Sequence, residues 1–472
     1  MEQLKITIKT LHNFEGILSE ELRELGFNNT EKQNRAVSLK GNWEDVYRLN
    51  YRCRLALSVL VEVDAFYVHK EDDLYKEARK VDWTSLFDNH KTFAVKGAIF
   101  STLFRHSNYP LLLVKDAIVD TFRDKTGKRP DVNRKSPQVV IDVYIKEKRV
   151  TLSVNTSGLP LFQRGYRQST GDAPINEVLA AGLLRMAQWD RKSPLINPMC
   201  GSGTIAIEAA LWAADIPSLV ERNHFAFKNF KSFEPQLWEK VRAEANHRPV
   251  DLGFPIIASD IDAAMIQKAR RNSRMAPIGR MITFETADIR DLNPDQKSGM
   301  LICNPPYGER LDEDVESLYE NIGDTFKKNF SGFSCWIISS NYEALKGIGL
   351  KPQAKMRVFN GSLECSFRGF EIVDGSYGPS KHVDSESQPI EDQVAEVETT
   401  QREKKEVDIE EQGSDKPKRE KRKERPSIHD EKSTENKDSS SKQSANEDIA
   451  DDNKSFKERI DDMRKYRKRS DD

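Results

Sequence analysis

The stretch INPMCGSGTIAIEAA, from Ile196 to Ala210, decides the fold because it passes from a hydrophobic strand through a glycine turn into a helix. This arrangement lets the backbone approach a ligand closely at a helix N-terminus. The turn is not a phosphate-binding loop, since no Gly-Lys-Ser/Thr follows. It also lacks the third glycine of a dinucleotide fingerprint, where Ala206 stands. The stretch therefore predicts a βα unit with a ligand site whose chemistry other residues must define.

Strands and helices alternate on the carboxyl side of this unit. The expected strands lie at 194–197, 255–259, 281–286, 299–304 and 334–340, and the expected helices at 204–214, 263–272 and 315–330. This alternation predicts an α/β domain with a doubly wound, parallel sheet. The final run breaks the rhythm, because Asn360-Gly361 separates two alternating segments and indicates a hairpin. The sheet is therefore expected to end in an antiparallel pair.

Two smaller modules are predicted before this domain. Residues 1–65 read strand, helix, strand, helix, strand, which indicates a small α+β module. Residues 66–156 repeat the logic with a strand, a long helix that stops at Gly127, and a hairpin. The predicted organisation is thus 1–65, 66–156, a catalytic domain at 157–380, and a tail at 381–472.

The tail has the composition of a disordered segment. It holds 22 Lys/Arg and 27 Asp/Glu in 92 residues, with one Phe, one Tyr and no Trp. Such a segment buries too little apolar surface to offset its ordering entropy. The tail carries a net charge of −5 and the rest of the chain +3, so the total of −2 hides a mildly basic body. A small positive balance is only weak support for a nucleic-acid partner.

Membrane and metal classes are disfavoured by the sequence. No apolar run reaches the roughly 18 residues that a membrane span needs, and the amino terminus has no signal-peptide core. The five cysteines form no C-x-x-C pair, which argues against a zinc site or a disulfide framework. We therefore expect a cytoplasmic, metal-free protein that does not associate with membranes and acts as a monomer.

Polar features follow four consecutive predicted strands. The glycine turn follows the first, Asp260 ends the second, Asp288 follows the third, and Asn304-Pro305-Pro306-Tyr307 follows the fourth. Ligands of open α/β sheets sit at the carboxyl ends of the strands, so these features are expected to meet. Asp260 is placed to accept both hydroxyls of a ribose. Asp288 could accept a hydrogen bond from an adenine amino group, but taken alone it is better explained as an ordinary turn aspartate.

The motif after the fourth strand resembles the catalytic motif of class I S-adenosylmethionine-dependent methyltransferases that act on exocyclic amino groups. The turn N-P-M-C-G-S-G-T resembles their cofactor motif, with Asn197 where the family usually has Asp. The resemblance implies that Asp260 holds the ribose and that Asp288 and Ile289 meet the adenine. It further implies a cofactor role for the turn residues Asn197, Pro198, Gly201, Gly203 and Thr204.

The segments before the catalytic domain narrow the resemblance. NTSGLPLFQRGYRQSTGDAPINEVLAAGLL (155–184) and HSNYPLLLVKDAIVDTF (106–122) resemble the linker and the THUMP module of THUMP-domain RNA methyltransferases. Within that family the chain is most similar to enzymes specific for guanine N2 of large-subunit ribosomal RNA. The resemblance covers roughly residues 1–374. It implies a Rossmann-like methyltransferase domain with a mostly parallel seven-stranded sheet, preceded by ferredoxin-like and THUMP modules. Bacterial relatives often carry a second methyltransferase domain after the first. This sequence has the charged tail at that place instead, so a single activity is expected here.

RNA contacts are expected mainly from the second module and the linker. Arg105, His106, Lys115, Arg164 and Arg167 are candidates to meet phosphates, although each alone is more typical of a solvated surface charge. Such contacts weaken with salt. Ribosomal RNA is favoured over transfer RNA by the resemblance alone.

The mechanism expected from the motif rests on hydrogen-bond acceptors. The side-chain oxygen of Asn304 and the carbonyl of Pro305 would accept hydrogen bonds from a guanine amino group, which is a poor nucleophile while its lone pair is delocalised. Pro306 would stiffen the corner. Tyr307 would stack on the extruded base. Because an asparagine is no base at neutral pH, positioning and electrostatics must supply most of the acceleration.

Several alternatives stay open at this point. A transfer RNA guanine-N2 enzyme, an adenine-N6 enzyme and an inactive RNA-binding or assembly factor share the same features. A nicotinamide dehydrogenase is disfavoured by the broken glycine fingerprint. A cysteine nucleophile at Cys303 or Cys200 is disfavoured as well, because Cys303 ends an apolar strand and free cysteine usually packs as a small hydrophobe.

Overall fold

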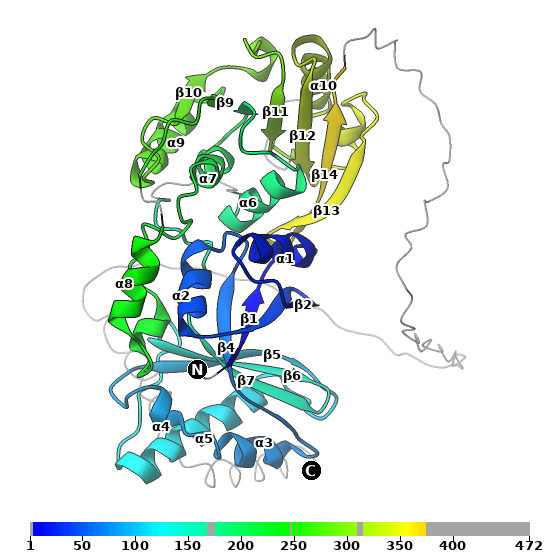
Figure 1. Cartoon of the computed structure of the whole chain (residues 1–472). Coiled ribbons are helices and arrows are strands. Elements are labelled where there is room, and N and C mark those ends of the chain that lie inside the picture. The colour runs from blue at the N-terminus through cyan, green and yellow to red at the C-terminus, as the bar shows by residue number, and fades with distance from the viewer. Residues whose placement is uncertain (1–2, 168–174, 246–247, 309–314, 374–472) are drawn as a thin grey trace, which may run out of the picture. The chain divides into compact units, whose positions relative to one another are not determined.

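The structure is a computed structural model that describes residues 3–167, 175–245, 248–308 and 315–373 (Figure 1). The tail that the sequence predicts to be disordered lies outside the described residues.

The first module forms one part of an amino-terminal sheet. Its strands are β1 (Leu4–Lys9), β2 (Thr30–Gln33), β3 (Ala36–Gly41) and β4 (Ser58–Tyr67), and its helices are α1 (Glu15–Glu24) and α2 (Trp43–Arg52). The predicted alternation of β1 is confirmed, since Ile6 and Ile8 are fully buried. Helix α2 begins at Asn42, whose side chain accepts from the backbone of Asp45 in a capping box. Strand β2 was not predicted, because its sequence TEKQ has no apolar residue.

The second module completes the same sheet. It adds β5 (Phe93–Phe100), β6 (Val139–Lys146), β7 (Arg149–Asn155), α3 (Glu71–Ala78), α4 (Trp83–Leu86) and α5 (Asn108–Thr126). Helix α5 ends at Gly127, whose φ of 69° is the left-handed conformation that favours glycine. Strand β4 pairs antiparallel with β7, so the order is β2-β3-β1-β4-β7-β6-β5. The predicted boundary at residue 65 therefore falls inside a strand that the two modules share.

The methyltransferase-type domain is built on a second seven-stranded sheet. Its strands are β8 (Leu195–Asn197), β9 (Ile256–Asp260), β10 (Ile282–Thr286), β11 (Gly299–Cys303), β12 (Phe333–Ser339), β13 (Ala354–Asn360) and β14 (Leu363–Glu371). Its helices are α6 (Glu177–Met186), α7 (Thr204–Ala213), α8 (Pro235–Ala243), α9 (Ala263–Met275) and α10 (Val315–Asn329), with short 3-10 turns η1 (Ala226–Asn229), η2 (Ile289–Asp291) and η3 (Ala344–Lys346). The predicted Rossmann-like class is confirmed.

The strand order of this sheet fixes where a ligand can sit. The order is β10-β9-β8-β11-β12-β14-β13, parallel from β10 to β12 and antiparallel at β14 (Figure 1). The chain leaves β8 in one direction and returns to β11 on its other side, which creates a topological switch point at their carboxyl ends. The predicted hairpin is also confirmed, because Asn360 pairs with Leu363 across a two-residue turn. The polar features named above all follow strands at this edge.

No helix among the described residues is long and apolar enough to cross a membrane. Within the same residues there is no group of three or more His, Cys, Asp or Glu side chains arranged to hold a metal ion.

Candidate active site

In the corner after β11, residues 304–307, two side chains are hydrogen-bonded to each other. Pro305 is buried, Pro306 is exposed, and Asn304 and Tyr307 are half-buried. The Tyr307 hydroxyl donates to the Asn304 Oδ1 at 2.6 Å. The oxygen expected to accept a hydrogen bond from a substrate is therefore already bonded within the chain. The sequence did not predict this contact, which occupies one of the two lone pairs of the Asn304 oxygen.

Residues from three elements that follow in the sequence contact the Asn304–Tyr307 corner. The Asn341 side chain, after β12, donates to the Tyr307 carbonyl at 3.3 Å. The Tyr319 hydroxyl, from α10, donates to the Pro306 carbonyl at 3.3 Å. The Cys365 thiol, from β14, lies 3.9 Å from the Tyr307 hydroxyl. Burial, and then the neighbouring Cys365, raise the pKa of Tyr307, so its hydroxyl stays a protonated donor at neutral pH.

The glycine turn before α7 has the backbone conformation that its sequence implies. Gly201 and Gly203 have φ of 55° and 82°, the left-handed region that disfavours side chains. A Cβ on Gly203 would lie 3.0 Å from the Ala269 Cβ of α9, whereas one on Gly201 would face open space. The turn thus packs tightly against α9 at one glycine and presents bare backbone at the other.

The Asn197 side chain links the glycine turn to β11, the strand that precedes the Asn304–Tyr307 corner. It is 1% exposed, and its Nδ2 donates to the Ile302 carbonyl of β11 at 2.8 Å. An aspartate could not donate this bond, which gives a structural reason for asparagine at this position. Its Oδ1 is buried without a hydrogen-bond partner among the described residues. A buried acceptor without a partner is unusual in a folded protein.

The two aspartates that were expected to meet the cofactor have different surroundings. Asp260 accepts from the Gly201 backbone at 2.9 Å and the Asp262 backbone at 3.0 Å, so its carboxylate is fixed against the turn. Burial raises its pKa, an effect that the two N–H groups partly offset. Asp288 instead forms an ion pair with Arg290, which lowers the pKa of its carboxyl. Asp260 is therefore positioned at the turn, whereas Asp288 is engaged by a neighbour.

The remaining cofactor candidates, Ile289, Thr204 and Pro198, are largely buried within the protein. Ile289 begins η2 and is 5% exposed within the hydrophobic core, so most of its surface is covered by protein. Thr204 begins α7, is 3% exposed, and accepts a hydrogen bond at its Oγ1 from the Arg167 guanidinium at 3.0 Å. Pro198 lies in the turn between Asn197 and Gly201 and is buried. The structure thus brings Asn197, Pro198, Gly201 and Asp260 to one edge and places Thr204 beneath them.

Two of the five proposed phosphate contacts are corrected by the structure. Arg164 is fully buried and pairs with Glu208 of α7, with 3.3 Å between Nε and Oε1. Lys115 lies within α5, is 6% exposed, and pairs with Asp116 at 3.2 Å. Neither side chain reaches an external phosphate, because long charged residues are buried only where protein groups satisfy them. Arg105 and His106 are exposed just before α5, so their side chains are accessible to a ligand.

Arg167 has a partner within the protein rather than a free charge. Its guanidinium bonds to Glu177 of α6 at 2.7 Å, to the Ile175 carbonyl at 2.9 Å, and to Thr204. It therefore ties the linker and α6 to the first residue of the helix that follows the glycine turn. Its role is to position these elements, and the proposed phosphate contact would have to compete with all three bonds.

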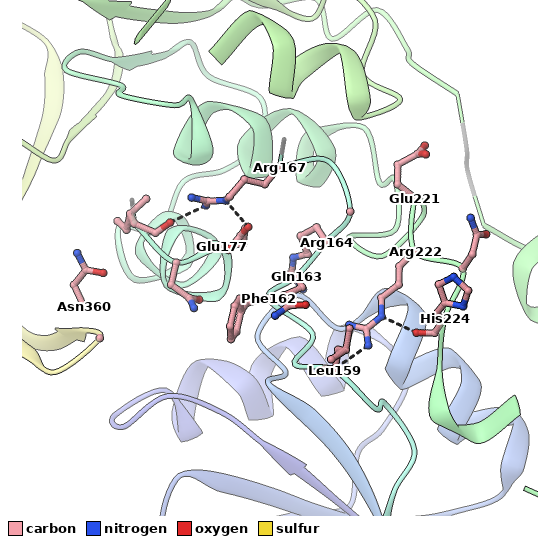
Figure 2. Close-up of a pocket in the computed structure, with 15 residues that line it drawn as sticks. Leu159, Phe162, Gln163, Arg164, Arg167, Glu177, Glu221, Arg222, His224 and Asn360 are labelled. Carbon is pink, nitrogen blue, oxygen red and sulfur yellow. Dashed lines mark hydrogen bonds and ion pairs between the residues drawn. The ribbon is translucent and has the colours of Figure 1, made fainter. Parts of the chain in front are cut away.

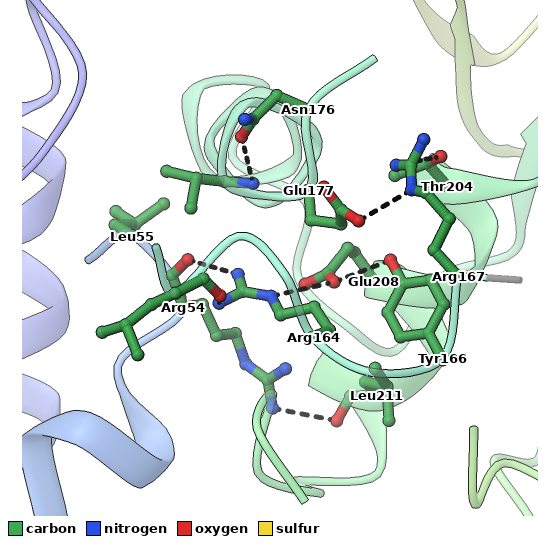
Figure 3. A network of polar contacts seen from close by, with 12 residues as sticks. Arg54, Leu55, Arg164, Tyr166, Arg167, Asn176, Glu177, Thr204, Glu208 and Leu211 are labelled. Carbon is green, nitrogen blue, oxygen red and sulfur yellow. Dashed lines mark hydrogen bonds and ion pairs between the residues drawn. The ribbon is translucent and has the colours of Figure 1, made fainter. Parts of the chain in front are cut away.

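Figure 3 shows the buried network in which Arg164 lies. Arg164 also donates to the carbonyls of Leu161 and Arg54, and the Tyr166 hydroxyl donates to Glu208 at 3.0 Å. Arg54, which follows α2, donates to the Leu211 carbonyl at 3.0 Å. Burial lowers the pKa of Arg54 to about 10. The network fastens the first module and the linker to α7, the helix that opens at the glycine turn.

A cavity of about 710 Å³ lies between the linker and the hairpin of β13 and β14. In the view of Figure 2, Arg167 and Glu177 lie between Asn360 on one side and Arg222 and His224 on the other. Asn360 also lies near the Tyr307 hydroxyl, so the cavity adjoins the corner after β11. Sequence reasoning missed Asn360, Glu177 and the supports of Tyr307, because none of them lies in a recognisable motif.

Comparison with known proteins agrees with this architecture. Residues 5–60 match the RlmL ferredoxin-like domain, residues 68–155 the THUMP domain, and residues 164–368 the RMKL-like methyltransferase domain. The chain is 37% identical over 367 residues to a "Ribosomal RNA large subunit methyltransferase K/L" from Shewanella frigidimarina. That match covers 76% of this chain and 51% of the relative, so the chain spans about half the length of this curated relative.

Solved structures share the fold over most of the chain. A structure described as "a putative methyltransferase complexed with SAH" is 27% identical, covers 80% of this chain and all of that one, and has a TM-score of 0.70. Another, described as "a predicted N6-adenine-specific DNA methylase" from Listeria monocytogenes, is 28% identical, covers 79% of this chain and 97% of that one, and has a TM-score of 0.70. The chain therefore carries, in this order, a ferredoxin-like domain, a THUMP domain and an RMKL-like methyltransferase domain.

Proposed function

We propose that this chain transfers a methyl group from S-adenosylmethionine to the exocyclic N2 amino group of a guanine in RNA, with large-subunit ribosomal RNA as the substrate. The observation that carries the proposal is the half-buried Asn304 carboxamide. Its oxygen is held at the switch point of the sheet by a hydroxyl that a substrate N–H can replace. The THUMP domain and the ribosomal RNA relative support RNA as the substrate class.

The residues at the carboxyl edge fit the cofactor. Bare backbone at Gly201 faces open space, the Asn197 Oδ1 is an unused buried acceptor, and Asp260 is a carboxylate fixed beside the turn. We infer that the turn holds the methionine portion and Asp260 the ribose. Asp288 would meet the adenine after its ion pair with Arg290 opens. When bound, S-adenosylmethionine supplies an electrophilic methyl group on a sulfonium.

The chain's own residues prepare the nucleophile by accepting hydrogen bonds. Asn304 Oδ1 accepts one amino N–H once Tyr307 turns away. The Pro305 carbonyl, which accepts no hydrogen bond from the described residues, accepts the other. Two such acceptors favour a pyramidal nitrogen whose lone pair is less delocalised. The released Tyr307 ring is then available to stack on the base. The buried Pro305 and the supports from Asn341 and Tyr319 keep this geometry rigid.

A cysteine nucleophile has no support in this geometry. Cys303 is fully buried at the end of β11, and burial raises its pKa. Burial, and then the neighbouring Asp260, raise the pKa of Cys200 as well. Both thiols therefore stay protonated at neutral pH, and only the thiolate is a strong nucleophile. The proton of the amino group is expected to leave to solvent after transfer.

The function is tested by nucleoside mass spectrometry of ribosomal and transfer RNA from a strain that lacks this chain. We expect N2-methylguanosine to disappear at one position of large-subunit RNA and to return when the gene is restored. A gene encoding the Asn304→Ala variant should not restore it. Loss of a methyl group from transfer RNA, or from adenine N6, would assign the chain to one of its rivals.

A further inference from the structure

The open face of the THUMP part of the amino-terminal sheet carries exposed aromatic rings. Phe100, Lys146, Arg149 and Tyr67 lie directly opposite one another on β5, β6, β7 and β4, and so share one face of the sheet. Tyr144 lies two residues before Lys146 and therefore on the same face. Helices α3, α4 and α5 cover the other side of this part of the sheet (Figure 1). We call the face defined by these five residues the aromatic platform.

The rings of the aromatic platform are exposed to an unusual degree. Tyr67 is 66% exposed, Phe100 61% and Tyr144 41%, whereas Ile145 and Val150 on the opposite face are fully buried. The Phe100 and Tyr144 ring centroids lie 6.0 Å apart at an interplanar angle of 61°. The row from β5 to β4 spans three strand spacings, about 14 Å. An apolar cluster left in water on a sheet that is otherwise well packed indicates a binding surface.

Unpaired cations surround these rings. Lys146 and Arg149 lie in the row itself, Lys148 is in the adjoining turn, and all three are exposed. None of these three cations forms an ion pair with the residues that the structure describes. The same turn also carries one carboxylate, Glu147, which pairs with none of them. At the inner end of the same face the charges are matched, because Lys9 pairs with Asp142 at 2.7 Å and Lys5 with Glu62 at 2.8 Å. Lys146, Lys148 and Arg149 thus place positive charge beside the rings that no carboxylate of the described residues pairs with.

We propose that the aromatic platform binds a single-stranded segment of RNA, with bases stacked on Tyr67, Phe100 and Tyr144 and phosphates near Lys146 and Arg149. Rings on an open sheet offer stacking to unpaired bases, and the flanking cations complement the backbone charge. Duplex RNA cannot use this surface in the same way, because its bases are already stacked. The inference rests on the proposed function for its choice of RNA, and adds a second contact region to Arg105 and His106.

The test compares ring removal with ring retention in the full-length chain. The probe is a fluorescent 12-nucleotide oligouridylate, and its affinity is measured by anisotropy without S-adenosylmethionine. Phe100→Leu and Tyr144→Leu keep apolar bulk but remove the rings, and each should weaken binding about tenfold. The double variant Tyr67→Phe with Tyr144→Phe keeps the rings and should bind within about twofold of the wild type. Lys146→Gln with Arg149→Gln should reduce the slope of log affinity against log salt by about 1.4.

The possible outcomes separate this proposal from the proposed function. Unchanged oligouridylate affinity in folded leucine variants would overturn the aromatic platform and leave methyl transfer untouched. A wild-type dimer that the leucine variants dissociate would overturn it too, since the face would then be a protein interface. If the leucine variants lose binding while the wild type methylates no RNA, the platform stands and the proposed function fails. Thermal unfolding and S-adenosylmethionine binding of each variant serve as folding controls.

Discussion

Asn304→Ala is expected to lower the turnover of methyl transfer by about a hundredfold to a thousandfold, the usual effect of losing one group that stabilises a transition state electrostatically. In the proposed mechanism this variant loses the carboxamide oxygen that would accept the substrate N–H, and neither proline of the corner has a side chain that could replace it. S-adenosylmethionine binding should change by less than about twofold, because Gly201 and Asp260 are held by bonds that do not involve Asn304. Single-turnover kinetics and calorimetry measure the two quantities separately.

Tyr307→Phe is the matched control for this variant. It removes the hydroxyl that occupies the Asn304 Oδ1 at 2.6 Å but keeps the ring that would stack on the base. Turnover should therefore be retained, with a lower KM for RNA, because the acceptor no longer has to be released. Normal turnover in Asn304→Ala, or a collapse of turnover in Tyr307→Phe, would contradict the assigned roles.

Arg164→Ala is expected to have the largest effect on stability, about 3–5 kcal/mol, because it leaves a buried carboxylate without its partner. Glu208 is fully buried, and its Oε2 already has no hydrogen-bond partner among the described residues. The loss of the bonds from Arg164 to the Leu161 and Arg54 carbonyls adds to this effect. Urea denaturation followed by tryptophan fluorescence gives the change in the free energy of unfolding.

The double variant Arg164→Met with Glu208→Leu removes both charges of the pair. Replacing both partners of a buried ion pair with apolar residues is often nearly neutral, so the part of the loss that comes from the unpaired carboxylate should return. The part that comes from the lost bonds to the Leu161 and Arg54 carbonyls should remain. If Arg164→Ala unfolds at the same urea concentration as the wild type, the network does not fasten the first module to α7. Arg52→Ala, which opens the exposed ion pair with Asp215, should cost less than about 1 kcal/mol.

The sheet of the catalytic domain could be predicted because its pattern is local. Each strand from β8 to β12 is a short apolar run, and α7, α9 and α10 follow expected strands at helical spacing. The hairpin at Asn360 was equally visible, since two-residue turns have a strong local signal. The pairing of β4 with β7 was not visible, because residues some 90 positions apart form it and no local pattern encodes their contact.

The candidate site could be predicted only in part for the same reason. Because parallel strands end at one edge of the sheet, the placement of Asn304, Gly201 and Asp260 at that edge could be predicted. The burial of Arg164 could not be predicted, because its partner lies 44 residues away and an arginine in isolation indicates the surface. The bond between Tyr307 and Asn304 depends on side-chain conformation, which the order of residues does not specify.

The central claim is tested most directly by supplying the purified chain with methyl-labelled S-adenosylmethionine and unmodified large-subunit ribosomal RNA. The RNA is then digested, and the labelled nucleosides are identified by mass spectrometry. We predict label in N2-methylguanosine at a single position, and none when Asn304→Ala replaces the wild type. Label in N6-methyladenosine, or incorporation into transfer RNA but not ribosomal RNA, would contradict the assigned substrate. The absence of label from every RNA tested would contradict the assigned reaction.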